Sequence, residues 1–207
     1  MTHIVYAEKM LIMKIFLLVL ILIFSFQSFT RADDISSFQI EGISIGDSLL
    51  DYFKTDKIKN FGQVSYPSSD KFVGWESTSD IKFESYDYMT FYVKKKDNNF
   101  KIFSMKGMKD YNNQLDQCLK EKKNVVKIIE DNLQLKKKID YDDNYAGKYG
   151  KSKAYITDFD LSGGGVIRIW CSNWDKKIKV SKNWTDALSV SANSKEYWIW
   201  LNSEAYK

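Results

Sequence analysis

The chain has 207 residues, of which 44% are hydrophobic and 15% are aromatic. This is enough for one sizeable core and too little for two comfortable domains. The formal net charge of +4 comes almost entirely from lysine, because Arg31 and Arg168 are the two arginines and acidic residues are interspersed throughout. Proteins that read nucleic acid favour arginine for its planar guanidinium group, so we expect no nucleic-acid partner.

The first 32 residues predict a secretory signal peptide. Lys14 precedes an apolar run over residues 15–26, and the small residue Ala32 stands before the polar Asp33. This order is typical of exported chains, and we expect cleavage between Ala32 and Asp33. A bilayer span needs ~20 apolar residues, so the run is short for an anchor. We expect a periplasmic or secreted protein; the alternative is an uncleaved inner-membrane anchor over residues 15–26, with no other membrane contact.

Residues 33–207 are expected to form a single α+β domain. A short helix is predicted from Asp47 or Ser48, with Asp51 placed as in a capping box. A loop over residues 61–80 with a short strand near 72–76 follows it. Apolar and polar residues then alternate, which predicts strands. These strands are expected at 81–84, 89–94 and 100–105, and the last of them ends at Gly107.

A long amphipathic helix is predicted over residues 112–135. Its apolar residues recur at spacings of three, four and seven, which places them on one helical face. They are Leu115, Cys118, Leu119, Val126, Ile129 and Leu133. Lys122 falls at the edge of this face, and we expect its ammonium group to reach outward to solvent. The polar, tyrosine-rich residues 136–152 that follow are expected to form a long loop.

A second group of strands is predicted after this loop. The segments concerned are 155–161 and 166–172, joined by a glycine-rich turn, and 188–192, which follows a loop over 173–185. A short helix that starts near Asn193 closes the chain. The sequence thus predicts an α+β fold in which two groups of antiparallel strands flank one long helix, with short helices near both ends. The order of a helix followed by strands occurs twice, without sequence identity between the two parts.

Two stretches of the sequence carry a resemblance to other proteins. Residues 34–53 read Asp-Ile-Ser-Ser-Phe-Gln-Ile-Glu-Gly-Ile-Ser-Ile-Gly-Asp-Ser-Leu-Leu-Asp-Tyr-Phe, and the tail contains Trp184-Thr-Asp and Glu204-Ala-Tyr-Lys. Both stretches resemble small exported proteins of unassigned function from AT-rich marine bacteria of the alphaproteobacterial group. The resemblance covers the whole chain after the signal peptide. It implies export from a Gram-negative cell and no particular chemistry.

Cys118 and Cys171 are the two cysteines of the chain, and both lie on predicted apolar faces. An exported chain reaches an oxidising compartment, where an even number of cysteines favours pairing. We therefore predict a disulfide that ties the long helix to the strand over residues 166–172. Two buried free thiols are the alternative.

Patterns for catalysis and metal binding are scarce after residue 32. The single histidine, His3, lies in the predicted signal peptide, so catalysis with a histidine base and the usual zinc sites are excluded. Residues 140–151 resemble the start of a calcium loop, but Tyr145 and Lys151 stand where that loop requires glycine and glutamate. We therefore expect neither a metal nor a cofactor.

Three tryptophans and one arginine form the candidate binding patch. Trp170, Trp174 and Trp184 lie close together in the sequence, partly in predicted loops. Arg168 shares a strand face with Trp170, because strand neighbours alternate. A cationic and aromatic surface of this kind suits a carbohydrate, a peptide or another protein of the cell envelope. The alternative is that these rings belong to a core covered by the C-terminal helix.

Two functions therefore remain open from the sequence. Because no catalytic set is recognisable, we expect an exported, non-enzymatic module that binds a partner or supports the envelope. Asp158 and Asp160 lie on one face of a predicted strand, and paired carboxylates can serve glycoside hydrolysis. A small metal-independent hydrolase that uses these two carboxylates is the alternative.

Overall fold

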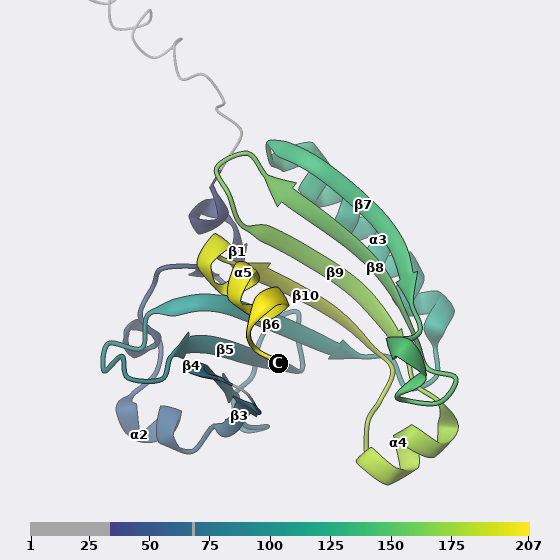
Figure 1. Ribbon diagram of the computed structural model, residues 1–207, viewed down its shortest axis with the longest axis horizontal. Coiled ribbons are helices and arrows are strands. Elements are labelled where there is room, and N and C mark those ends of the chain that lie inside the picture. The colour runs from purple at the N-terminus through teal and green to yellow at the C-terminus, as the bar shows by residue number, and fades with distance from the viewer. Residues whose placement is uncertain (1–33, 68) are drawn as a thin grey trace, which may run out of the picture. The chain divides into compact units, whose positions relative to one another are not determined.

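The computed structural model describes residues 34–67 and 69–207 (Figure 1). The predicted signal peptide, with its apolar run over residues 15–26 and its cleavage site between Ala32 and Asp33, lies outside the described residues. The described chain combines helices with an eight-stranded antiparallel sheet and a two-stranded sheet. This is the α+β fold that the sequence predicts.

The first half of the described chain supplies short helical segments, the two-stranded sheet and four strands of the large sheet. These elements are η1 (Ile35–Ser37), β1 (Gln39–Ile40), β2 (Ile43–Ser44), η2 (Leu49–Asp51), α2 (Thr55–Lys59), β3 (Gly62–Tyr66), β4 (Ser69–Glu76), β5 (Tyr88–Lys94) and β6 (Ile102–Asp110). The Ser48 hydroxyl accepts a hydrogen bond from the Leu50 amide at 3.1 Å, and the Asp51 carboxylate accepts one from the Ser48 amide at 3.3 Å. The predicted capping box therefore begins η2.

The second half supplies the long helix, the other four strands and two further α-helices. These elements are α3 (Leu115–Asn132), β7 (Leu135–Asp143), η3 (Tyr145–Gly147), β8 (Lys153–Leu161), β9 (Val166–Asn173), α4 (Lys176–Lys182), β10 (Ala187–Asn193) and α5 (Lys195–Ser203). The long helix predicted over residues 112–135 is thus confirmed with slightly shorter bounds. The C-terminal helix begins after Ser194, whose hydroxyl accepts a hydrogen bond from the Tyr197 amide at 3.2 Å.

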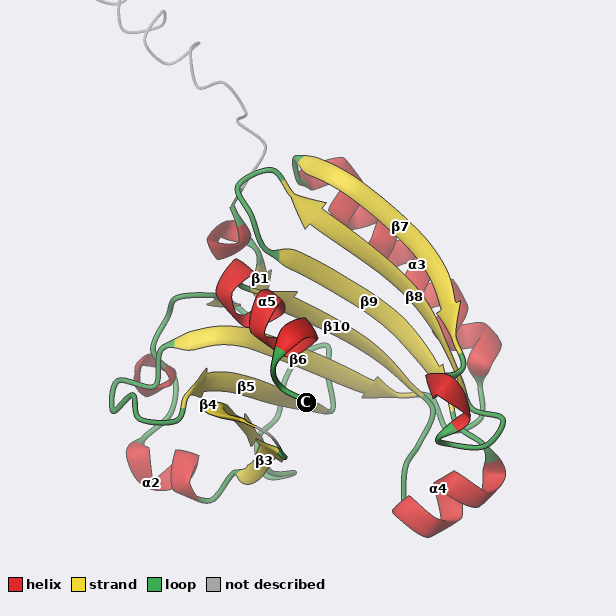
Figure 2. Cartoon of the chain, in the orientation of Figure 1, coloured by secondary structure: helices red, strands yellow, loops and turns green. Residues whose placement is uncertain are grey.

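The strands of the large sheet are ordered β3-β4-β5-β6-β10-β9-β8-β7 (Figure 2). Each half of the chain forms four neighbouring strands after a helix. The last strands of the two halves, β6 and β10, pair antiparallel in the middle of the sheet, with Gly107 opposite Val190. The edge strands are β3 and β7. The order of a helix followed by strands that occurs twice in the sequence thus corresponds to two groups of four strands that meet at their last strands.

The sheet carries helices on both faces, which we call the α3 face and the α5 face (Figure 2). On the central strand β10, Leu188, Val190 and Ala192 belong to the main core on the α3 face. Ser189 and Ser191 alternate with them and therefore point to the α5 face. The alternation that defines a strand thus also separates an apolar face from a polar one.

A smaller aromatic cluster anchors α5 to the opposite face. Tyr197 and Trp200 of α5 are buried against Phe72 of β4 and Tyr92 of β5. Ring centroids lie 4.9 Å apart for Phe72 and Trp200, and 5.1 Å apart for Tyr92 and Tyr197. This cluster therefore anchors α5 over the first half of the sheet.

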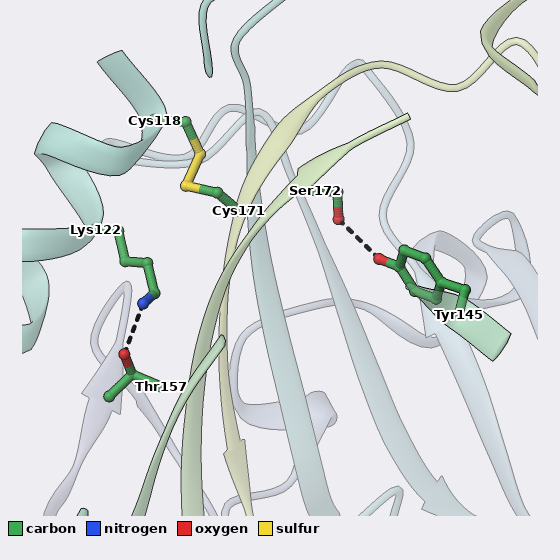
Figure 3. Close-up of a disulfide and its surroundings, with 6 residues drawn as sticks. All are labelled: Cys118, Lys122, Tyr145, Thr157, Cys171 and Ser172. Carbon is green, nitrogen blue, oxygen red and sulfur yellow. Dashed lines mark hydrogen bonds between the residues drawn. A yellow bond between two sulfur atoms is a disulfide. The ribbon is translucent and has the colours of Figure 1, made fainter. Parts of the chain in front are cut away.

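Cys118 of α3 and Cys171 of β9 form the predicted disulfide (Figure 3). The two Cα atoms are 6.0 Å apart, and both side chains are fully buried. Lys122, one turn further along α3, donates a hydrogen bond to the Thr157 hydroxyl on β8 at 2.7 Å. The expectation that Lys122 reaches outward is therefore wrong, because a polar partner on the sheet satisfies its ammonium group beside the disulfide.

The loop predicted over residues 136–152 is wrong in its first half, where β7 pairs with β8. Most residues of β7 are exposed, and Lys136, Lys137 and Lys138 precede a run of acidic residues. Edge strands carry such charges on both faces, which prevents further pairing. The alternation that marks a half-buried strand is consequently missing from the sequence of β7.

Other connections also differ from the sequence prediction. The expected strand at 81–84 is absent from the described chain, where Ile81 and Phe83 instead pack on the main core from the β4–β5 connection. Much of the loop predicted over 61–80 is strand. The strand expected to end at Gly107 continues to Asp110, because residues 108–110 pair with β10. Gly107 lies within this strand because the Tyr86 ring occupies the space where a Cβ would lie. A residue with a side chain at this point would clash with that ring.

The loop predicted over residues 173–185 contains the short helix α4. Asp175 begins this helix by accepting a hydrogen bond from the Lys177 amide at 2.8 Å. None of its residues is buried, and Val180 is 80% exposed. Without a buried face, α4 has no apolar periodicity from which a helix could be predicted.

Candidate functional site

A row of polar side chains crosses the middle of the α5 face. Directly opposite residues on neighbouring strands form it, and we call it the polar row. Its members, in strand order from β4 to β8, are Glu76, Thr90, Lys106, Ser191, Arg168 and Asp158. Cross-strand neighbours of this kind have their Cβ atoms close enough for direct contact. The register of six strands therefore brings together residues that are up to 115 positions apart in the sequence.

The polar row passes through a cavity of about 320 Å³ between the sheet and α5, which we call the central cavity. Lys106, Ser191 and Arg168 contribute from the row, and Ser104 and Asn193 contribute hydroxyl and amide groups beside it. Aromatic rings form much of the remaining lining, including those of Tyr92, Tyr145, Trp170, Trp198 and Tyr206, and one carboxylate, Asp143, also lines the cavity. Small side chains on β10 between larger ones on β6 and β9 leave the space that forms the cavity.

Arg168 is held firmly at one side of the central cavity. Its guanidinium group donates two hydrogen bonds to the Asp158 carboxylate, at 2.7 and 2.8 Å, and a third to the Tyr141 hydroxyl at 2.8 Å. The Trp198 ring of α5 lies over it, with the guanidinium carbon 4.6 Å from the ring centroid. Burial acts to lower the pKa of Arg168, but the hydrogen bonds and charge of Asp158 outweigh it, so the pKa is raised. Arg168 therefore stays charged and positions Trp198.

A second hollow lies on the same face and is larger, about 800 Å³; we call it the outer groove. Its lining includes Trp174 and Trp184 together with the carboxylates of Glu76, Asp87 and Asp110. Lys106 lines both hollows. The two hollows are therefore neighbours along the sheet, and this lysine lies at their junction.

Stacked aromatic rings connect the two hollows. Trp174 lies 4.6 Å from Trp184 and stacks on Tyr145 at 4.9 Å, measured between ring centroids. Tyr145 in turn lines the central cavity, and its hydroxyl is 3.3 Å from that of Ser172 on the side of β9 opposite the disulfide (Figure 3). Its backbone φ of 52° is unusual for a tyrosine. Such strain persists where the surrounding structure holds the residue, here the hydroxyl contact and the stacked ring.

A buried carboxylate, that of Asp186, holds Trp174 in place at the outer groove. Asp186 is almost fully buried and accepts hydrogen bonds from the Trp174 amide at 2.7 Å and from the Lys179 ammonium group at 2.5 Å. These bonds tie α4 and the segment before it to the residue that precedes β10. Trp174 is therefore held in place by its backbone, and its ring serves as the support for Trp184, which is 37% exposed.

The predicted patch of Arg168, Trp170, Trp174 and Trp184 is thus divided between the two hollows. Arg168 and Trp170 share the α5 face, as strand alternation predicts, and line the central cavity. Trp174 and Trp184 line the outer groove. The alternative, a core beneath the C-terminal helix, also holds in part, because Trp198 covers Arg168 and Trp170 is half-buried.

Sequence reasoning missed the residue that the two hollows share. Lys106 lies between Met105 and Gly107 in a strand whose alternation is plain, so its face could be predicted from the sequence. Its place beside Ser191 depends on the pairing of β6 with β10, which no local pattern indicates. Tyr145 was missed for a similar reason, since it lies in the segment predicted to be a loop.

The carboxylates considered for hydrolysis are placed differently from one another. Both oxygens of Asp158 accept hydrogen bonds from Arg168, and Tyr141 donates another at 3.1 Å. Asp160 lies outside this network, two residues along β8. Within residues 34–67 and 69–207, no group of three or more His, Cys, Asp or Glu side chains is arranged to hold a metal ion.

Comparison with known proteins gives no relative: no family model, no curated protein and no solved structure matches this chain. Among the described residues, no helix has the length and apolar composition needed to cross a membrane. The site therefore has to be interpreted from its own geometry.

Proposed function

We propose that the protein is an exported, non-enzymatic binding module whose central cavity takes a small organic ligand or the end of a chain. The observation that carries this proposal is the lining of the cavity, which combines aromatic rings with hydroxyl, amide and charged groups. Its volume of about 320 Å³ is in the range of small-molecule sites, which combine apolar walls with a few polar groups that fix orientation.

Export is supported by the predicted signal peptide and by the disulfide. Structural disulfides persist in oxidising compartments such as the bacterial periplasm. The Cys118–Cys171 bond is fully buried between α3 and β9, where it serves the core of the fold. A periplasmic or secreted location follows as part of the proposal.

The hydrolase has less support. A general acid or base must exchange a proton with the substrate, and a nucleophile needs a free oxygen. The Asp158 carboxylate is engaged on both oxygens by Arg168, at 2.7 and 2.8 Å. Its geometry is that of a residue that holds Arg168 in place.

Binding to arrays of glycans and of short peptides tests the proposal. A ring or apolar group flanked by hydrogen-bonding groups occurs in both kinds of ligand, and the two arrays distinguish them. We expect wild-type protein, purified without residues 1–32, to bind a limited set of ligands, and Trp170→Ala to lose most of that binding. Ile199→Ala is the matched control, because Ile199 is an apolar side chain of α5 that is 55% exposed and outside the cavity lining.

Two results would contradict the proposal. One is the absence of any ligand on both arrays that depends on Trp170. The other is turnover of an array ligand that Asp158→Asn abolishes while the variant remains folded by circular dichroism, because that result would support the hydrolase.

A further inference from the structure

Lys106 occupies a central place in the α5 face. It lies on β6, the last strand of the first half, and its neighbour across the β6–β10 pairing is the small residue Ser191. The space above Ser191 is part of the central cavity, and on its other side Lys106 lines the outer groove. The side chain is half-buried, so its ammonium group is only partly available to bulk water.

The two cations that line the central cavity differ in whether a counter-ion contacts them. Arg168 forms a bidentate ion pair with Asp158, whose side chain is 10% exposed. The ion pairs among the described residues do not include Lys106. Glu76, two strands away in the polar row, accepts a hydrogen bond from Thr90 at 3.2 Å. Arg168 therefore has its counter-ion within the fold, whereas Lys106 has none in direct contact.

A partly buried cation without a counter-ion is unfavourable for stability. Burial lowers the pKa of Lys106, and the negative charge of Glu76 offsets this only in part. Replacement of Lys106 by an apolar residue of similar length would remove that cost without opening a cavity. The presence of Lys106 at the junction of two hollows is therefore explained more directly by a ligand that pairs with it than by a contribution to the stability of the fold.

We propose that the ligand of the central cavity carries a carboxylate that pairs with Lys106, while its ring or apolar part lies against Trp170 and Tyr145. This inference rests on the proposed binding function and specifies the chemical class of the ligand. A carboxylate at this position would accept charge-assisted hydrogen bonds from the ammonium group in a site from which much of the water is excluded. Arg168, whose charge is already paired with that of Asp158, would contribute shape and the position of Trp198.

Matched aromatic fragments that differ in charge alone test the proposal. The probes are 3-phenylpropionate, its amide 3-phenylpropionamide, and 3-phenylpropylamine, each titrated into wild-type protein and followed by tryptophan fluorescence and by ligand-observed NMR. We expect the carboxylate to bind at least about tenfold more tightly than the amide, which corresponds to about 1.4 kcal/mol. The amine is expected to bind most weakly.

Three variants assign the preference to a residue. Lys106→Met keeps the length of the side chain without its charge, so carboxylate and amide should then bind equally. Lys106→Arg keeps the charge and should retain the preference. Lys109→Met is the matched control, since Lys109 lies three residues further along β6, is exposed and points to the other face. It should bind like wild type.

The outcomes separate this inference from the proposed function. If the fragments bind in a manner that Trp170→Ala abolishes, but without preference for the carboxylate, the binding function stands and the role of Lys106 is overturned. The same conclusion follows if Lys106→Met keeps the preference. If none of the three probes shows binding that depends on Trp170, both the role of Lys106 and this use of the central cavity are overturned.

Discussion

The two faces of the large sheet are built from the same strands and yet serve different ends. On the α3 face, Phe159, Ile167, Ile169 and Val190 are buried in one continuous core, to which the disulfide adds a covalent tie. On the α5 face, the same strands carry the polar row and two hollows. A strand supplies both because its side chains alternate between faces with every residue.

Because adjacent residues of a strand lie on opposite faces, one residue can contribute to the core while the next lines a hollow. Neighbours such as Ile169 and Trp170 differ in what they contact, although they are adjacent in the chain. Substitutions on the α3 face should therefore change the free energy of unfolding, and those on the α5 face should change binding more than stability. Three predictions test this contrast in order of expected effect.

The largest effect is expected from removal of the disulfide. In the double variant Cys118→Ala/Cys171→Ala, the unfolded chain is no longer constrained by a loop of 53 residues, worth about 4 kcal/mol on the chain-entropy model. Urea denaturation followed by circular dichroism measures the free energy of unfolding of both proteins. Wild-type protein under reducing conditions is the parallel measurement. A loss below about 1 kcal/mol in both experiments would show that the covalent tie matters little to the α3 face.

The adjacent residues Ile169 and Trp170 should differ in their effects on stability. Ile169 is fully buried on the α3 face, so Ile169→Ala should lower the free energy of unfolding by about 3 kcal/mol through lost contacts and a cavity. Trp170 is half-buried on the α5 face, and we expect Trp170→Ala to cost about 1–2 kcal/mol although it removes a larger side chain. Denaturation midpoints decide the order. A greater loss for Trp170→Ala would place this ring in the core and remove it from the proposed site.

The smallest effect is expected at the start of α5. Glu196 lies 3.2 Å from both Lys71 and Lys94, and its side chain is 41% exposed. Burial acts to raise the pKa of Glu196, but the hydrogen bonds from the two lysines outweigh it, so the pKa lies below its ordinary value of 4.5. Its contribution is therefore present above that value and is lost as the pH falls through the lowered pKa.

Glu196→Gln measures this contribution. Because the group is largely solvated, we expect the variant to be less stable than wild type by under about 1 kcal/mol at neutral pH. The two proteins should become equally stable in acid, where Glu196 of the wild type is protonated. A difference that persists in acid would mean that the carboxamide perturbs α5 for another reason than charge.

Much of the α3 face could be predicted from the sequence. The helix around Cys118 and Ile129 shows its period directly, the strands that carry Phe91 and Ile167 alternate clearly, and the cysteine pair follows from their count and the predicted export. These features are local or nearly so. The elements that sequence reasoning missed, β7 and α4, are exposed, and an exposed element shows no apolar period.

The candidate site was less predictable because it depends on register between distant strands. Arg168 and Trp170 could be placed on one face of one strand, but their relation to Lys106 requires β10 to lie between β9 and β6. A shift of one residue in that pairing would move Lys106 to the other face. Trp174 and Trp184 were grouped with Arg168 by proximity in the sequence, whereas their distance on the sheet is set by β10 and α4.

The central position of β10 governs the order in which the fold can be completed. A chain that emerges from the ribosome with its N-terminus first presents β3 to β6 long before residues 187–193 exist, and the same holds for a chain that is threaded across a membrane. Until then β6 is an open edge, with unpaired backbone groups that could recruit another chain. Closure of the sheet must await the last tenth or so of the polypeptide, so termination between β9 and β10 would leave the strands β3–β6 and β7–β9 as two unjoined groups with open edges prone to aggregation.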